Sequence, residues 1–160
     1  MTDNQTVQKE DTLLKKVFRL IFLLVCVNAV GVVGGSFMTE ESMMWYKSLP
    51  LPSLTPPDYI FSIVWPILYV LMAISMFLVW NKASPRFFAL QLMCTALWPF
   101  VFFYLHSVQG GIGVIVALIV LLGLTIKTFY PVSKTAGLLL VPQLLWSFFA
   151  LYLNSAILWG

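Results

Sequence analysis

The amino-acid sequence predicts an all-α integral membrane protein: a bundle of five transmembrane helices, with a long proline-rich loop between helices 1 and 2. Three observations support this fold class, namely the composition, five apolar stretches and a cluster of prolines. Of the 160 residues, 61% are hydrophobic and 9% are charged, whereas water-soluble domains carry about 25% charged residues. With so few charges the apolar surface cannot be hidden from water, so the solvent of this chain is expected to be lipid.

The five apolar stretches are each about 20 residues long, which lets a helix cross a hydrocarbon core of about 30 Å. A backbone inside the bilayer must satisfy its own hydrogen bonds, and a helix does so within one segment. The expected helices span about residues 16–38, 58–80, 86–105, 110–130 and 135–159. Residues 1–14 are polar and are expected to form an N-terminal tail, so that residues 15–160 make up a single five-helix transmembrane domain.

The first helix contains a GxxxG spacing, from Gly31 to Gly35. Small residues at this spacing let two helix backbones approach closely. The spacing fits packing within the bundle or a seam between two copies of the chain, and we favour packing within the bundle.

The connection between the first two helices, residues 39–57, is the longest one. It ends in the stretch LPLPSLTPP, which holds Pro50, Pro52, Pro56 and Pro57. Proline fixes φ and donates no backbone hydrogen bond, so this stretch cannot be ordinary helix. Long ordered connections in compact domains are usually functional.

The second, third and fifth helices combine prolines with tryptophans. The pairs Trp65–Pro66 and Trp98–Pro99 lie at similar depths, and Trp146 follows Pro142 by one turn. Prolines kink helices and free backbone carbonyls. Three kinked helices with bulky aromatics at neighbouring depths are expected to surround a cavity that opens toward the long loop.

Helical spacing places polar and aromatic side chains of these helices on shared faces. Polar side chains in lipid prefer the bundle interior, so Gln91, Thr95 and Asn154 indicate that their faces point inward. The faces comprise Ser62, Trp65, Tyr69 and Met72 on the second helix, Gln91, Thr95, Trp98 and Phe102 on the third, and Pro142, Trp146, Phe149, Ala150 and Asn154 on the fifth. They fit a ligand cavity, and they also fit plain core packing with interhelical hydrogen bonds.

The basic residues predict an orientation in the membrane. The residues on the same side of a five-helix path as the N-terminus are Lys9, Lys15, Lys16, Arg19, Lys82, Arg86, Lys127 and Lys134, and only Lys47 falls on the other side. The positive-inside rule therefore predicts a cytoplasmic N-terminus and a C-terminus outside.

Several classes of function lack their characteristic residues. No Asp, Glu, Lys or Arg lies deep within the apolar stretches, although ion-coupled transporters usually keep a carboxylate there. Cys26 and Cys94 have no metal or redox spacing and are expected to be packing residues. His106, the only histidine, is expected to lie at the membrane interface. No metal or cofactor is expected, and without a basic patch beyond the N-terminal segment nucleic acid is not expected as a partner.

Three motifs resemble those of one known family. The stretch WYKSLPLPSLTPPDYIFSIVWPILY, from Trp45 to Tyr69, resembles its first-loop signature. QLMCTALWPFVFF, beginning at Gln91, resembles its third-helix motif, and AGLLLVPQLLWSFFALYLN, ending at Asn154, resembles its fifth-helix motif. The family is that of the tryptophan-rich sensory proteins, also called translocator proteins or peripheral-type benzodiazepine receptors (TspO/MBR).

The resemblance implies a five-helix membrane protein, commonly a homodimer, that binds porphyrins, sterols and benzodiazepine-type drugs in a pocket under the first loop. The fifth helix ends in LNSAILWG, without the Tyr and basic residue of the family's sterol-recognition segment. Porphyrins such as protoporphyrin IX therefore rank above sterols. The ligand-binding residues expected are Trp45, Tyr46, Pro52, Trp65, Tyr69, Gln91, Thr95, Trp98, Phe102, Trp146, Phe149, Ala150 and Asn154.

Three functions stay open at this point. The chain is a receptor or carrier of porphyrins, an enzyme that degrades protoporphyrin in light, or a passive transporter of tetrapyrroles or sterols. The resemblance assigns a catalytic role in the degradation to Trp65 and Trp146. The sequence shows no conventional acid–base constellation, which favours binding.

Overall fold

The computed structural model describes the backbone of residues 2–159 and the side chains of residues 12–159, and all elements in this part of the chain are helical. They are α1 (Thr2–Gly35), α2 (Glu40–Ser48), α3 (Asp58–Leu78), α4 (Arg86–Pro99), a π-helical segment (Phe100–Tyr104), α5 (Val108–Phe129), α6 (Lys134–Leu138) and α7 (Val141–Trp159). Five stretches are long and apolar enough to cross a membrane: Thr12–Gly35, Asp58–Leu78, Arg86–Tyr104, Val108–Phe129 and Lys134–Trp159. The predicted fold class, an all-α bundle with five membrane spans, is confirmed.

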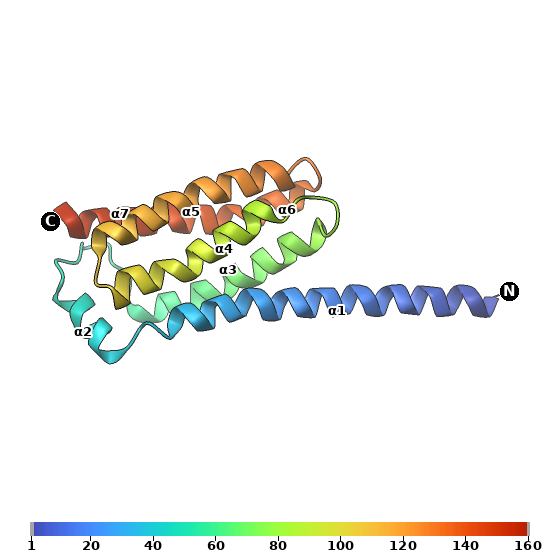
Figure 1. Ribbon diagram of the computed structural model, residues 1–160, viewed down its shortest axis with the longest axis horizontal. Helices are drawn as coiled ribbons and strands as arrows, with labels where there is room; N and C mark the ends of the chain where they lie inside the picture. Colours follow the sequence, from blue (N-terminus) through green and yellow to red (C-terminus); the bar gives the residue numbers. More distant parts are fainter. Residues whose placement is uncertain (1, 160) are drawn as a thin grey trace.

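The long helices lie side by side along one axis (Figure 1). α1 packs against α3 and α4, α4 packs against α5, α5 packs against α7, and α6 contacts α3. α2 and the C-terminus lie at one end of the bundle, called the α2 end below, and α6 lies at the opposite end, called the α6 end (Figure 1). The N-terminal part of α1 extends beyond the α6 end (Figure 1).

The first helix has different bounds from those expected. It begins at Thr2, so residues 2–14, expected as a separate tail, continue the backbone helix of α1. Once a helix is nucleated, adding residues to it costs little, and Gln, Lys and Glu in this segment are good helix formers. α1 ends at Gly35 rather than near residue 38, because two consecutive glycines weaken the helix there.

The connection between α1 and α3 contains a helix that was not expected. The Oγ1 of Thr39 accepts a hydrogen bond from the backbone N–H of Ser42 at 3.2 Å, which caps the N-terminus of α2. Glu40 and Glu41 occupy its first turn, where negative charge favours the helix dipole. α2 ends at Ser48, and the four prolines lie in the non-helical residues 49–57 that follow.

The prolines inside the spans act differently from one another. Pro66 lies within α3 without ending it, whereas Pro99 is followed by the π-helical segment, in which Leu105 N–H donates to Phe100 O at 3.0 Å. The span expected at 135–159 is interrupted at residues 139–140, between α6 and α7. Pro142 explains this interruption, because it has no N–H to donate to the carbonyl of Leu138.

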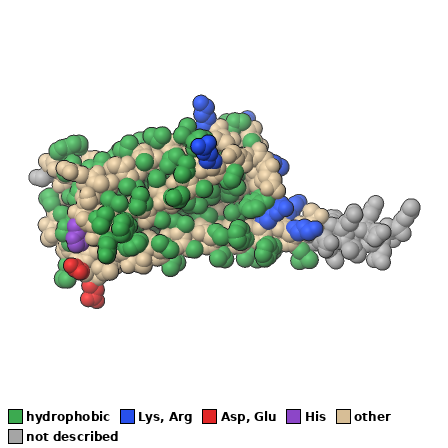
Figure 2. Space-filling view, in the orientation of Figure 1, with side chains coloured by type: hydrophobic (Ala, Val, Ile, Leu, Met, Phe, Trp, Pro, Cys, Tyr) green, Lys and Arg blue, Asp and Glu red, His purple; other side chains and the backbone are tan. Residues whose placement is uncertain are grey.

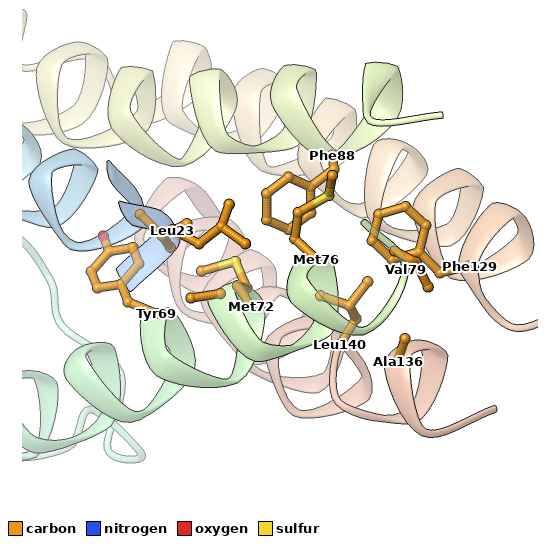
Figure 3. Close-up of a cluster of buried hydrophobic side chains, with 11 residues drawn as sticks. Leu23, Tyr69, Met72, Met76, Val79, Phe88, Phe129, Ala136 and Leu140 are labelled. Atoms are coloured by element: carbon orange, nitrogen blue, oxygen red, sulfur yellow. The ribbon is translucent and has the colours of Figure 1, made fainter. Parts of the chain in front are cut away.

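One cluster of buried apolar side chains lies toward the α6 end and is drawn in Figure 3, and a smaller one, formed by Phe102, Phe103 and Ile157, lies nearer the α2 end. The first cluster joins Leu23 of α1, Met76 of α3, Phe88 of α4 and Phe129 of α5, with Leu140 between α6 and α7. The rings of Phe88 and Phe129 stack with their centres 5.9 Å apart. This tightly packed half holds the five spans in place around the other half, which contains a cavity.

Charged side chains gather at the two ends, with an apolar surface between them (Figure 2). Four basic residues lie at the α6 end: Lys82 in the connection between α3 and α4, Arg86 at the start of α4, Lys127 in the last turn of α5 and Lys134 at the start of α6. The guanidinium of Arg19 lies 5.7 Å from the ring centre of Trp80 at the same end. Apolar side chains between the ends are exposed, as lipid-facing ones would be; Val25 is 63% and Val120 is 56% exposed.

Candidate functional site

A cavity of about 600 Å³ occupies the half of the bundle nearer the α2 end. Its walls come from α1, α3, the α4 span and α7, and side chains of α2 cover it. The lining residues are Asn28, Gly31, Val32, Gly34, Gly35 and Met38 from α1 and the turn after it, Met43 and Tyr46 from α2, Asp58, Phe61, Ser62, Trp65, Pro66 and Tyr69 from α3, Thr95, Trp98, Pro99, Phe102 and Phe103 from the α4 span, and Ala150, Leu153, Asn154 and Ile157 from α7.

Two stacked aromatic pairs from different helices line this cavity. On α3, the rings of Trp65 and Tyr69 stack with their centres 5.5 Å apart and an interplanar angle of 28°. On the α4 span, Trp98 and Phe102 stack at 5.2 Å and 16°. Both pairs follow the one-turn spacing of a helix. The lining of the cavity therefore includes aromatic rings from two helices.

A second, smaller cavity of about 30 Å³ adjoins the first. Trp65, Trp98 and Thr95 line both cavities, while Trp146 and Ser147 of α7 line only the smaller one. The ring of Trp146 contacts that of Phe61 at 5.7 Å, which links α7 to α3.

α2 is anchored over the cavity by ring contacts with the α4 span. Trp45 packs on Phe102 at 5.4 Å and stacks on the imidazole of His106 at 4.5 Å. Tyr46 contacts Phe103 at 5.8 Å and itself lines the cavity. These three ring contacts bury part of α2 and hold it against the bundle.

The start of α3 also meets α2. The ammonium of Lys47 lies 3.9 Å from a carboxylate oxygen of Asp58, but both side chains are well over half exposed, so this ion pair contributes little. Burial, and to a lesser extent the Asp58 carboxylate, raises the pKa of the Tyr46 hydroxyl above its usual value. Tyr46 therefore presents a neutral phenol to the cavity at physiological pH.

Polar atoms in the cavity are few. The hydroxyl of Thr95 donates to the carbonyl of Gln91 at 2.9 Å, and the amide Nδ2 of Asn154 donates to the carbonyl of Ala150 at 2.9 Å. The Oδ1 of Asn154 and the Nε1 of Trp98 are buried and have no hydrogen-bond partner among the described residues. These described residues also contain no group of three His, Cys, Asp or Glu side chains that could hold a metal ion.

The structure brings most of the expected site residues together. Those on the larger cavity are Tyr46, Trp65, Tyr69, Thr95, Trp98, Phe102, Ala150 and Asn154, and Trp146 lies on the smaller one. The remaining expected residues do not line either cavity. Trp45 packs behind Phe102, Phe149 lies between Trp146 and Tyr152, and Pro52 accepts a hydrogen bond from Thr55 N–H in the connection before α3. Gln91 is fully buried beside Met72, toward the packed core.

Residues of α1 line the cavity, although sequence reasoning did not assign them to it. Asn28, Gly31 and Gly35 recur at helical spacing, and this pattern in an otherwise apolar helix is the signal that could have identified the face. Of the two glycines in the GxxxG spacing, only Gly31 is in close contact within the bundle: a Cβ there would overlap the ring of Tyr69, whereas one at Gly35 would meet nothing within 4 Å. Gly34, which lies outside the spacing, also packs closely, since a Cβ there would lie 3.2 Å from Pro99.

Comparisons with known proteins point in one direction. The sequence model of the TspO/MBR family matches residues 22–160 of this chain. The chain is 38% identical over 151 residues to "Tryptophan-rich protein TspO" of Chlorobaculum tepidum. The matched region covers 88% of this chain and 96% of that protein. It is 34% identical over 148 residues to "Tryptophan-rich protein TspO" of Archaeoglobus fulgidus, with 88% and 95% covered. It is 28% identical over 134 residues to "Translocator protein" of Homo sapiens, with 78% and 79% covered.

Proposed function

The chain belongs to the TspO/MBR family, and from this premise we propose that it is a membrane receptor or carrier for planar hydrophobic ligands. The ligands are porphyrins such as protoporphyrin IX and benzodiazepine-type compounds, which bind in the cavity under α2. The observation that carries this proposal is the pair of stacked aromatic walls, Trp65 with Tyr69 and Trp98 with Phe102, on a cavity of about 600 Å³. Small-molecule pockets usually measure about 300–1,000 Å³.

The walls suit a flat conjugated ligand for a physical reason. An aromatic face is attracted to another in an offset stack, and each such pair contributes about 0.5–1.5 kcal/mol beyond the burial of its area. A macrocycle in this cavity can contact aromatic rings of both α3 and the α4 span. Much of the remaining lining is aliphatic, including Val32, Leu153 and Ile157, so the ligand also leaves water or lipid headgroups for an apolar environment.

Titration of the purified protein with protoporphyrin IX tests the proposal. The ligand should quench tryptophan fluorescence to saturation at one ligand per chain. Trp65→Phe should weaken the affinity for the porphyrin by roughly twofold to tenfold, because phenylalanine retains only part of the indole ring surface that lines the larger cavity. Trp159→Phe is the matched control, because Trp159 is 80% exposed at the end of α7 and lines neither cavity. No saturable quenching in the parent protein would sink the proposal.

A second function is favoured by the position of Trp65 and Trp146 on the same small cavity. We propose as the alternative that the chain degrades bound protoporphyrin in light, with these two indoles as its redox-active groups. Illumination of the complex should then remove the Soret band and yield a new chromophore, and both Trp→Phe variants should slow this loss. A stable Soret band in illuminated complex leaves binding or transport as the function.

A third proposal concerns transport and orientation. The name of the human relative, Translocator protein, describes transport for that protein. For this chain, the corresponding proposal is that a tetrapyrrole or sterol moves passively through the cavity. The α6 end of the bundle faces the cytoplasm in this proposal. The cluster of Lys82, Arg86, Lys127 and Lys134 at that end supports this orientation.

A further inference from the structure

His106 lies in the short connection between the π-helical segment and α5, and hydrogen bonds on both sides hold its backbone. The N–H of Leu105 donates to the carbonyl of Phe100 at 3.0 Å, and the N–H of Ser107 donates to the carbonyl of Val101 at 3.2 Å. The φ of His106 is 50°, in the left-handed region that histidine adopts more readily than most residues. Its side chain is exposed, so a fixed backbone presents the imidazole at the surface.

The imidazole stacks on Trp45 of α2, with the ring centres 4.5 Å apart and an interplanar angle of 25°. Trp45 also packs on Phe102 at 5.4 Å, and the neighbouring Tyr46 packs on Phe103 at 5.8 Å. Non-helical connections join α2 to α1 and α3, so these ring contacts help to hold α2 over the cavity. Histidine is the side chain that ordinarily changes its charge between about pH 5 and 8. The contact with His106 is therefore the one among them that depends on pH.

Protonation changes the nature of this stack. A neutral imidazole and an indole attract each other as two aromatic rings. An imidazolium, in contrast, is a cation over the negative face of an indole, which is the best aromatic partner for a cation. The two ring centres are well within the separation of about 6 Å at which this attraction acts. The charged form of His106 therefore holds Trp45, and α2 with it, more strongly than the neutral form does.

The charges of α2 act in the same direction. Glu41 lies one helical turn before Trp45 and so on the same face of α2, where its carboxylate attracts an imidazolium. The acidic side chains visible in Figure 2 lie at this end of the bundle. Among the described residues, the charged groups at the α2 end are Glu40, Glu41, Lys47 and Asp58.

The other groups at this end do not compete for the contact. Lys47 lies two residues after Trp45, on another side of α2, and its ammonium is 3.9 Å from Asp58. The tyrosines of α2 and of the π-helical segment are Tyr46 and Tyr104. Tyrosine ordinarily ionises at about pH 10, well above the range in which histidine titrates.

The N-terminus of α5 opposes a positive charge on His106, because α5 begins at Val108. α5 does not move with α2, so this effect is the same whether α2 covers the cavity or has left it. Only interactions that differ between these two states couple protonation to the position of α2. The stack on Trp45 and the attraction to Glu41 differ between them, and both favour the covered state.

We propose that His106 makes the closure of α2 over the cavity dependent on pH: its protonation strengthens the stack on Trp45, and a bound ligand then dissociates more slowly. Histidine is ordinarily charged below about pH 6.5. The added retention is therefore present at about pH 5.5 and is lost as the pH rises to about 7.5. This inference rests on the proposed function, since it concerns the release of the ligand that the cavity is proposed to bind.

Hydrogen exchange of the ligand-free protein tests the position of α2. The backbone amides of α2 are compared between the parent and His106→Asn at about pH 5.5 and about pH 7.5. Asparagine tolerates the left-handed backbone, but it has no ring and does not titrate. The intrinsic exchange rate depends on pH equally in both proteins. The protection of α2 in the parent relative to the variant should therefore rise about twofold to fivefold on acidification.

Stopped-flow dissociation measures the retention of a ligand. Protoporphyrin IX dimethyl ester is the probe, because it has no carboxyl group that would itself titrate in this range. It should leave the parent about twofold to fivefold more slowly at the acidic pH. The dissociation rates from His106→Asn and from Trp45→Leu should depend little on pH, since each variant lacks one ring of the stack.

Two further variants make the result specific. His106→Arg carries a guanidinium, which is always charged and stacks on aromatic faces. Its dissociation rate should be slow at both pH values, and it decides the case should His106→Asn fail to fold. Trp159→Phe is the control, because Trp159 lines neither cavity and the stack of Trp45 on His106 stays intact. It should keep the pH dependence of the parent.

The outcomes separate the role of His106 from the proposed function. The role of His106 is overturned if the protection of α2 and the dissociation rate depend on pH alike in the parent and in His106→Asn, whereas saturable binding of the ester would still support the proposed function. If α2 gains protection in acid while the dissociation rate stays constant, His106 does not retain the ligand and the proposal is wrong. Absence of binding of the ester and of protoporphyrin IX overturns the proposed function, and hydrogen exchange then still decides whether His106 holds α2.

Discussion

At the residue scale, two glycines one turn apart on α1 have opposite surroundings. A Cβ at Gly31 would overlap the Tyr69 ring, whose Cζ would lie 2.9 Å away, whereas a Cβ at Gly35 would meet nothing within 4 Å. Tyr69 stacks on Trp65, so the close approach of α1 to α3 at Gly31 also supports one aromatic wall of the cavity. The two positions form a matched pair on one helix.

Gly31→Ala should destabilise the protein and disturb the cavity together. The added methyl must push the Tyr69 ring or separate α1 from α3, and overpacking of this kind costs about 1–3 kcal/mol. We expect a lower thermal unfolding temperature in detergent and a weaker affinity for protoporphyrin IX.

Gly35→Ala is the control for this experiment. It should be neutral, or should stabilise the helix by about 0.5–1 kcal/mol, because alanine loses less backbone entropy than glycine on folding. Equal unfolding temperatures for Gly31→Ala and Gly35→Ala would contradict the close contact between α1 and α3.

At the element scale, the connection over the cavity is part helix and part proline segment. α2 is held by the ring contacts of Trp45 and Tyr46, and residues 49–57 lead from it to α3. Pro57 is the N-cap of α3, with φ −56° and ψ 146°. Since proline restricts φ before as well as after binding, these residues keep α2 near its position over the cavity even without a ligand.

Replacing Pro56 and Pro57 together by Gly should loosen this arrangement. Each substitution widens the ensemble of unbound conformations at a cost of about 0.4–1 kcal/mol. The affinity should then fall by about fourfold to thirtyfold, mainly through faster dissociation, because a displaced α2 lets the ligand leave. Stopped-flow dissociation of protoporphyrin and of a benzodiazepine-type ligand measures this, and both should be affected alike.

Pro85→Gly provides the control, because Pro85 is the N-cap of α4 at the opposite end of the bundle. Its dissociation rates should equal those of the parent. If the Pro56/Pro57 variant also matches the parent, these prolines only direct the chain into α3 and α2 does not act as a cover.

At the scale of the whole molecule, the charges define two unlike ends separated by an apolar surface (Figure 2). Ser84 lies exposed between α3 and α4 at the cationic α6 end, and Ser48 lies exposed at the end of α2. The positive-inside rule predicts that the α6 end faces the cytoplasm.

Cysteine labelling in intact cells tests this orientation. In a background in which Cys26 and Cys94 are replaced by Ala, a membrane-impermeant maleimide should label Ser48→Cys and not Ser84→Cys. After permeabilisation both should react, which controls for the reactivity of each site. Labelling of Ser84→Cys alone in intact cells would reverse the orientation.

The spans were predictable from the sequence because the bilayer sets their length. About 20 apolar residues are needed to cross it, so composition alone identified the five helices to within a few residues at most of their ends. The prolines likewise indicated departures from regular helix, although not that Pro66 stays within α3 while Pro142 separates α6 from α7. Thr39 and the two glutamates after it carry the N-cap signal of α2, although no helix was predicted there.

The residues that line the cavity could be predicted only in part. Helical spacing gives the direction of a side chain around the helix axis, but it does not show whether the cavity extends to that height along the axis. Gln91 and Thr95 lie one turn apart on the same face of α4, yet Thr95 lines the cavity and Gln91 is buried beside Met72.

By itself, then, the sequence determined the five spans, their apolar surface, the cationic end and the aromatic faces that point inward, because each depends on residues close together in the chain. The tertiary structure alone decided where the packed core stops and the cavity begins, and that Trp98 and Asn154 meet beside Gly111. These features depend on which helices pack against one another and at what height, and no local pattern in the chain encodes that.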